Sequence, residues 1–87
     1  MRLLTKTLVI KSEAGVHPQS ATVLVQTSSK FQSEIYLAYK EKKVNLKSIM
    51  GVMSLGIPPG AEIKIEVTGE DEQEALQSVS DTIEKLV

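Results

Sequence analysis

His17 carries the most distinctive chemistry of this sequence, because it is the only histidine and lies between a glycine loop and a predicted helix start. Gly15 precedes it, and Pro18 suits the first position of a helix. At a helix start the imidazole meets free backbone N–H groups and the positive end of the helix dipole. These surroundings favour a neutral, nucleophilic ring and suit an anion attached to it. His17 is therefore predicted to accept a phosphoryl group; the alternative is a histidine that only caps the helix or lies on the surface.

A second group of candidates surrounds a short helix that is predicted to begin after Ser48. We expect the Ser48 hydroxyl to cap this helix by accepting a bond from a backbone N–H two or three residues on. A phosphate at Ser48 would be tolerated at a helix N-terminus and would change the local surface. Ile49, Met50 and Met53 cannot all face the core from so short a helix, so some are expected to form an exposed partner surface. The simpler alternatives are capping alone and core packing.

The composition limits the functions that this chain can have. It has 87 residues, 41% of them hydrophobic and 24% charged, which is typical of one small globular domain, here residues 1–87. A net charge of −1 argues against direct nucleic-acid binding. With no cysteine and one histidine, a thiolate or multi-histidine zinc site is excluded, and no metal or organic cofactor is indicated. Charges interrupt the apolar runs near the N-terminus, so membrane insertion is not expected and a cytoplasmic location is predicted.

Hydrophobic patterns predict the elements that position these residues. Alternation at period two predicts four strands, from Leu4 to Lys11, Ser33 to Tyr39, Lys42 to Leu46 and Ala61 to Thr68. Helical spacing after Pro18 places one face of a helix at Ala21, Leu24, Val25, Ser28 and Phe31. Asp71 and Glu74 resemble a capping box in front of a last helix that runs to the end of the chain.

The predicted order is therefore β-α-β-β-α-β-α, which is an α+β fold. A four-stranded antiparallel sheet with one apolar face needs helices across that face. We expect an open-faced β-sandwich, with the sheet covered on one face by three helices.

The segment from Val44 to Ile57, together with Ala21 to Thr27, resembles HPr, the histidine-containing phosphocarrier family of the sugar phosphotransferase system, in its Gram-positive form. The similarity spans essentially the whole chain and implies the same open-faced sandwich. It implies that enzyme I donates a phosphoryl group to His17 and that sugar-specific IIA domains receive it. Such a carrier is not an enzyme, because it is itself the substrate that is modified.

The same resemblance implies a regulatory role. HPr kinase/phosphorylase would phosphorylate Ser48 with ATP, and the phosphorylated form would bind catabolite control protein A in carbon catabolite repression. The implied contact surface for that regulator consists of Ile49, Met50 and Met53.

The motif around the histidine departs from the family pattern. The usual Gly-Ile/Leu-His-Ala-Arg-Pro-Ala is replaced by the sequence of residues 15–21, Gly-Val-His-Pro-Gln-Ser-Ala. Gln19 offers only neutral donors in place of the arginine, and Pro18 removes a backbone N–H at the helix start. Ser20 restores a backbone N–H where the family has proline. Gln19 and Ser20 are therefore the candidate phosphate-supporting residues, and slower transfer through His17 is expected.

Three functions remain open at this point. The first is a working or impaired phosphocarrier. The second is a mainly regulatory protein that resembles the catabolite-repression HPr paralogue, with Ser48 phosphorylation but weak or no histidine transfer, although that paralogue usually lacks the histidine. The third is a scaffold with an altered binding motif, because His17-Pro18-Gln19 resembles the tripeptide of streptavidin-binding peptides.

Overall fold

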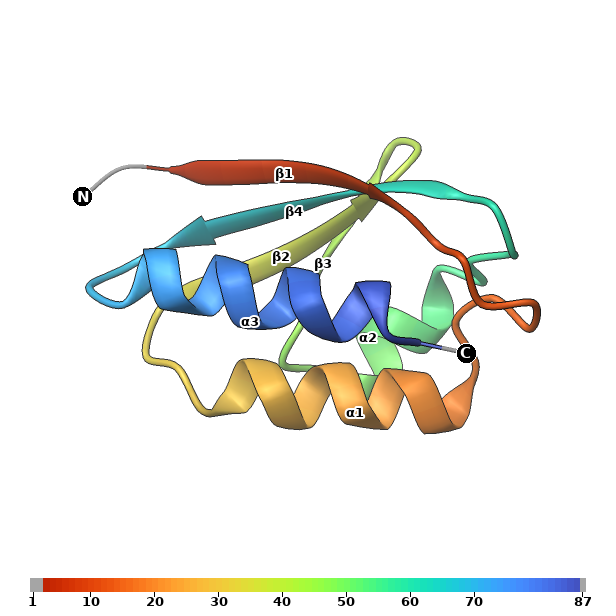
Figure 1. Ribbon diagram of the computed structural model, residues 1–87, viewed down its shortest axis with the longest axis horizontal. Coiled ribbons are helices and arrows are strands. Elements are labelled where there is room, and N and C mark those ends of the chain that lie inside the picture. Colours follow the sequence, from red (N-terminus) through yellow and green to blue (C-terminus); the bar gives the residue numbers. More distant parts are fainter. Residues whose placement is uncertain (1–2, 87) are drawn as a thin grey trace.

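The computed structural model describes residues 3–86, and its elements follow the predicted order β-α-β-β-α-β-α (Figure 1). Met1, Arg2 and Val87, which belong to the predicted single domain, lie outside the described residues. The elements are β1 (Leu4–Val9), α1 (Pro18–Ser29), β2 (Glu34–Tyr39), β3 (Lys42–Asn45), α2 (Ile49–Ser54), β4 (Glu62–Thr68) and α3 (Glu72–Glu84).

The four strands form one antiparallel sheet in the order β1-β4-β2-β3. The central strand β4 alternates as predicted: Ile63, Ile65 and Val67 are buried, whereas Glu62 and Lys64 on the other side are exposed. All three helices lie on the side of the sheet that carries the buried residues (Figure 1). The predicted open-faced β-sandwich is confirmed.

The two long helices pack against each other on this face, and the start of α1 lies beside the end of α3 (Figure 1). Ala21 and Leu24 of α1 and Val79 and Ile83 of α3 are at most 1% exposed, so the helical faces read from the sequence are the ones that the core uses. Helix α1 is shorter than predicted, because Phe31 lies in the bend that follows it. There the backbone N–H of Phe31 donates to the carbonyl of Ser28, a tight turn that ends the helix.

Each strand also differs from the prediction at one end by one or two residues, and β2 and β4 begin one residue later than predicted, at Glu34 and Glu62. Strand β1 stops at Val9 and β3 stops at Asn45, although the chain keeps its backbone pairing for one residue more. The N–H of Ile10 donates to the Ala61 carbonyl at 2.9 Å. The N–H of Leu46 donates to the Ile35 carbonyl at 2.8 Å.

The predicted capping box of Asp71 and Glu74 is wrong. Asp71 is the N-cap residue of α3, but its side chain makes no bond to its own helix. The carboxylate instead accepts from the backbone N–H groups of Gln32 and Ser33, both at 2.9 Å, and from the Ser33 hydroxyl. Asp71 therefore ties the turn before α3 to the bend after α1, a contact between distant segments that residue spacing cannot reveal.

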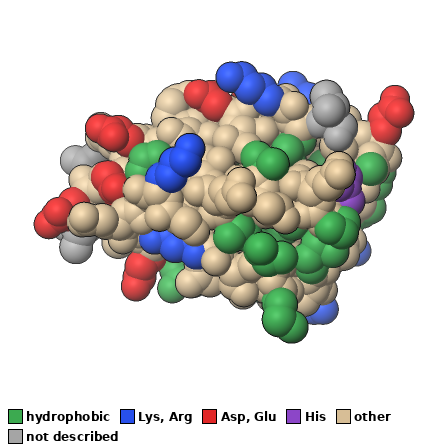
Figure 2. Space-filling view, turned by 90° about the horizontal axis from the view of Figure 1, so that it is seen from below, with side chains coloured by type: hydrophobic (Ala, Val, Ile, Leu, Met, Phe, Trp, Pro, Cys, Tyr) green, Lys and Arg blue, Asp and Glu red, His purple; other side chains and the backbone are tan. Residues whose placement is uncertain are grey.

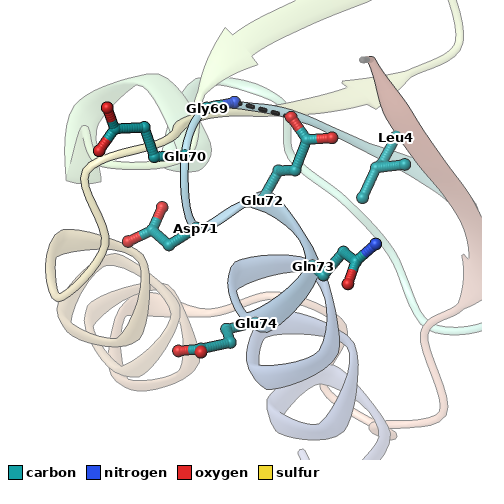
Figure 3. A pocket seen from close by; sticks show the side chains of 7 residues that line it. All are labelled: Leu4, Gly69, Glu70, Asp71, Glu72, Gln73 and Glu74. Carbon is teal, nitrogen blue, oxygen red and sulfur yellow. Dashed lines mark hydrogen bonds between the residues drawn. The ribbon is translucent and has the colours of Figure 1, made fainter. Parts of the chain in front are cut away.

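The turn before α3 is shaped by Gly69 and Glu72. The Gly69 N–H donates to a carboxylate oxygen of Glu72 at 3.1 Å (Figure 3). Gly69 has φ of 157°, and a Cβ there would lie 2.5 Å from the Cα of Ser33. Only glycine lets the two segments approach closely enough for the Asp71 bonds to form.

The Asp71 contacts make stability depend on pH. Donation by the Ser33 hydroxyl, followed by donation from the Gln32 N–H, holds the pKa of Asp71 below its ordinary value. Because the folded-state pKa is lowered, the carboxylate stabilises the fold above its unfolded pKa of about 3.9, and this contribution is lost as the pH falls through the folded value. We expect Asp71→Asn to lower the melting temperature at pH 7, and we expect its difference from the unsubstituted protein to shrink as the pH falls through the folded-state pKa of Asp71.

Glu74→Gln is the matched control, because it removes one carboxylate charge from the first turn of α3 while leaving the Asp71 bonds intact. Thermal unfolding followed by circular dichroism from pH 2 to pH 7 measures both variants. Equal melting temperatures for Asp71→Asn and Glu74→Gln at pH 7 would contradict this role of Asp71.

Candidate functional site

His17 is the N-cap residue of α1, and Pro18 is the first residue of the helix, as predicted. The Nδ1 atom of His17 accepts a hydrogen bond from the backbone N–H of Gln19 at 3.2 Å. In a neutral ring the proton therefore lies on Nε2, and the Nδ1 lone pair is directed at the helix start. The predicted proximity of the ring to free backbone N–H groups is confirmed.

Ser20 holds the backbone of His17 in place. Its buried hydroxyl accepts from the His17 N–H at 2.9 Å and donates to the His17 carbonyl at 3.1 Å. This reciprocal arrangement is a capping box. The Ser20 side chain is thus already occupied, which leaves its backbone N–H as the group able to face a ligand on the ring.

The loop before His17 is fixed against the segment that precedes β4. The Val16 N–H donates to the Ile57 carbonyl at 3.0 Å, and Gly15 has φ of 68°. A Cβ on Gly15 would collide with the Ile57 carbonyl oxygen and lie 2.9 Å from the carbonyl carbon of Pro58. A glycine is required here for both the backbone conformation and the close approach, and this docking sets where His17 is held.

A groove of about 460 Å³ runs beside the histidine, between the start of α1 and the end of α3. It is lined by His17, Gln19, Ser20, Val23, Thr82, Lys85 and Leu86. Sequence reasoning did not single out the three residues from the end of α3. No local signal marks them, because their proximity to His17 depends on how α3 packs against α1.

Ser48 lies at the start of α2, where its hydroxyl accepts from the Gly51 N–H at 3.1 Å. The predicted cap is confirmed, and Ser48 is exposed. Ile49, Met50 and Met53 are exposed by 44%, 84% and 37%, so the predicted exposure on this helix is confirmed and core packing does not explain them. Hydrophobic side chains gather near the histidine on the face shown in Figure 2.

Within residues 3–86, no three His, Cys, Asp or Glu side chains are grouped so that they could hold a metal ion. None of the helices in this part of the chain is long and apolar enough to cross a membrane.

Fold and site together define a small open-faced β-sandwich that presents one histidine at the N-terminus of its first helix. The family model for the PTS HPr component phosphorylation site matches residues 4–85, and the chain belongs to this PTS-HPr family. The family is one of phosphocarrier proteins.

Solved structures agree with this assignment. The phosphocarrier protein HPr from Bacillus anthracis is 33% identical with a TM-score of 0.89, and the match covers 94% of this chain and 98% of that one. HPr-C-His from Thermoanaerobacter tengcongensis is 45% identical with a TM-score of 0.88, over 97% and 92% of the two chains. Crh, the catabolite repression HPr of Bacillus subtilis, is 36% identical with a TM-score of 0.71, over 97% and 100%.

The docking of Gly15 leads to a prediction about stability. Gly15→Ala should lower the free energy of unfolding by more than the roughly 1 to 2 kcal/mol that a left-handed backbone costs an alanine, because the Ile57 carbonyl must also move. Gly60→Ala is the control, since Gly60 has φ of 79° but no atom within 4 Å of the added Cβ. Urea denaturation measures the free energy of unfolding of both variants. Equal losses in Gly15→Ala and Gly60→Ala would show that the close approach at Gly15 does not contribute to stability.

Proposed function

We propose that this protein is a cytoplasmic phosphocarrier that receives a phosphoryl group on His17 from enzyme I and passes it to sugar-specific IIA domains. The observation that carries the proposal is the Nδ1 atom of His17. Among the described residues it has no side-chain partner and accepts only the Gln19 N–H at 3.2 Å. It is thus an unprotonated nitrogen at the positive end of α1.

The chemistry needs no further reagent. The Nδ1 lone pair attacks the phosphorus of the phosphohistidine on enzyme I and forms a new N–P bond. The N–P bond on the donor breaks, and its electron pair remains on the donor ring. Nε2 of His17 keeps its proton, so the ring is positively charged while Nδ1 carries the phosphoryl group. The ring becomes neutral again when a nucleophile of the IIA domain attacks the phosphorus and the N–P bond on His17 breaks. The protein thus carries one phosphoryl group between the two transfers and is unmodified again after the second.

Backbone N–H groups support the attached phosphoryl group in this proposal. Gln19 and Ser20 supply two of them at the positive end of the helix, while Pro18 supplies none. The Gln19 side chain, exposed beside the ring, adds a neutral donor. Neutral donors stabilise a phosphoryl group less than a guanidinium does, so transfer slower than in relatives with arginine at this position is expected.

A regulatory phosphorylation at Ser48 forms the second part of the proposal. The Ser48 hydroxyl is exposed at the surface, where HPr kinase/phosphorylase can reach it with ATP. Exposed Ile49, Met50 and Met53 next to it form an apolar surface suited to catabolite control protein A. The similarity to Crh favours a mainly regulatory protein as the second candidate function, with little or no transfer through His17.

The histidine reaction is tested with phosphoenolpyruvate and enzyme I. We expect acid-labile phosphate on the unsubstituted protein and none on His17→Asn. Asparagine is a suitable change because it keeps a helix-capping side chain, so the melting temperature should change little. A folded, unsubstituted protein that takes no acid-labile phosphate would contradict the carrier function and favour the regulatory one.

The serine reaction is tested with ATP and HPr kinase. Ser48→Ala should abolish the acid-stable phosphate. Ser54→Ala should not, although Ser54 is an exposed serine of the same helix whose hydroxyl donates to the Gly51 carbonyl at 2.6 Å. Label that persists in Ser48→Ala would place the modification elsewhere.

A further inference from the structure

The end of α3 brings a cation to the groove beside His17. Lys85 is the C-cap residue of α3, where its backbone N–H donates to the Asp81 carbonyl at 3.1 Å. It lines the same groove as His17 and Gln19, and among the described groove residues it is the only lysine or arginine. Figure 1 shows the end of α3 beside the start of α1.

Within residues 3–86 the Lys85 ammonium has no ion-pair partner, and no acidic side chain lines the groove. The carboxylate one helical turn earlier, Asp81, accepts from the Gln77 amide at 2.9 Å and does not line the groove. The described residues therefore place a lysine with no ion-pair partner among them in the same groove as the histidine ring.

We propose that the Lys85 ammonium contacts the phosphoryl group on His17 and supplies the positive charge that Gln19 cannot. This inference rests on phosphoryl transfer to His17 as proposed above. A phosphoryl group on the ring carries up to two negative charges, whereas the donors of α1 that face it are all neutral. The long, flexible lysine stem lets the ammonium follow the phosphoryl group as it arrives and leaves.

Phosphoramidate tests the contact without enzyme I. His17 displaces ammonia from the phosphorus of this reagent, so the N–P bond on His17 forms as that of phosphoramidate breaks. Lys85→Met keeps the apolar stem and removes the charge, and Lys85→Arg restores the charge. Lys30→Met is the matched control, because Lys30 is the exposed C-cap residue of α1 and the same charge is removed there.

Lys85→Met should slow phosphorylation by phosphoramidate about fivefold, as expected for loss of a solvent-exposed ionic contact. It should also raise the pKa of the phosphoryl group, because the substitution removes a nearby cation that favours the dianion. Titration followed by ³¹P NMR measures this pKa. Lys85→Arg should keep the rate and the phosphoryl pKa of the unsubstituted protein, and Lys30→Met should change neither quantity. A purely structural role for Lys85 would leave the phosphoryl titration unchanged.

This design distinguishes failure of the Lys85 contact from failure of the relay function. If Lys85→Met matches Lys30→Met in both readings, the inference is overturned, whatever enzyme I does. If the Lys85 effect is seen with phosphoramidate but enzyme I transfers nothing to the unsubstituted protein, the cation contact stands and the relay function fails.

Discussion

The central strand β4 buries one side only, and the rest of the molecule is arranged around that asymmetry. Ile63, Ile65 and Val67 face the helices, while Glu62 and Lys64 face outward. Because only one face of the sheet must be covered, α1 and α3 lie side by side on it. Their packing brings the start of one helix next to the end of the other, and the groove that contains His17 lies at that end.

The site is built almost entirely from backbone groups and helix termini. His17 stands where α1 begins, held by the Ser20 hydroxyl on one side and by the docked loop at Gly15 on the other. The proposed phosphocarrier function needs no buried cofactor or deep cavity, because a phosphoryl group on His17 would only be carried. The exposed apolar residues of α2 form a surface of the kind that commonly marks a protein–protein contact.

Local signals predicted most of this arrangement. The alternation in β4, Pro18 at the first position of α1 and the Ser48 cap all depend on neighbours within a few residues, so the sequence alone contains them. Features formed by distant segments were not predicted. The spacing of Asp71 and Glu74 predicts a bond within the last helix. The bonds from the backbone N–H groups of Gln32 and Ser33 form instead, and these donors become available only when the two turns meet.

Lys85 is the clearest case of a residue whose position near His17 could not be predicted from the sequence. In the linear chain it is one of several charges on the last helix, and only the packing of α3 against α1 brings it into the groove with His17. The order of the strands in the sheet likewise depends on pairing across the whole chain. Short-range patterns therefore identified His17 and its neighbours Gln19 and Ser20, but not the residues that α3 contributes to the groove.

The proposed phosphocarrier function depends above all on the Nδ1 atom of His17 being the nitrogen that reacts. Long-range ¹H–¹⁵N NMR of the protein after phosphorylation by enzyme I and phosphoenolpyruvate measures this directly, because the two ring nitrogens give separate signals. We expect a phosphoryl group on Nδ1 and the proton on Nε2. A phosphoryl group on Nε2, or a ring that remains unmodified, would contradict it.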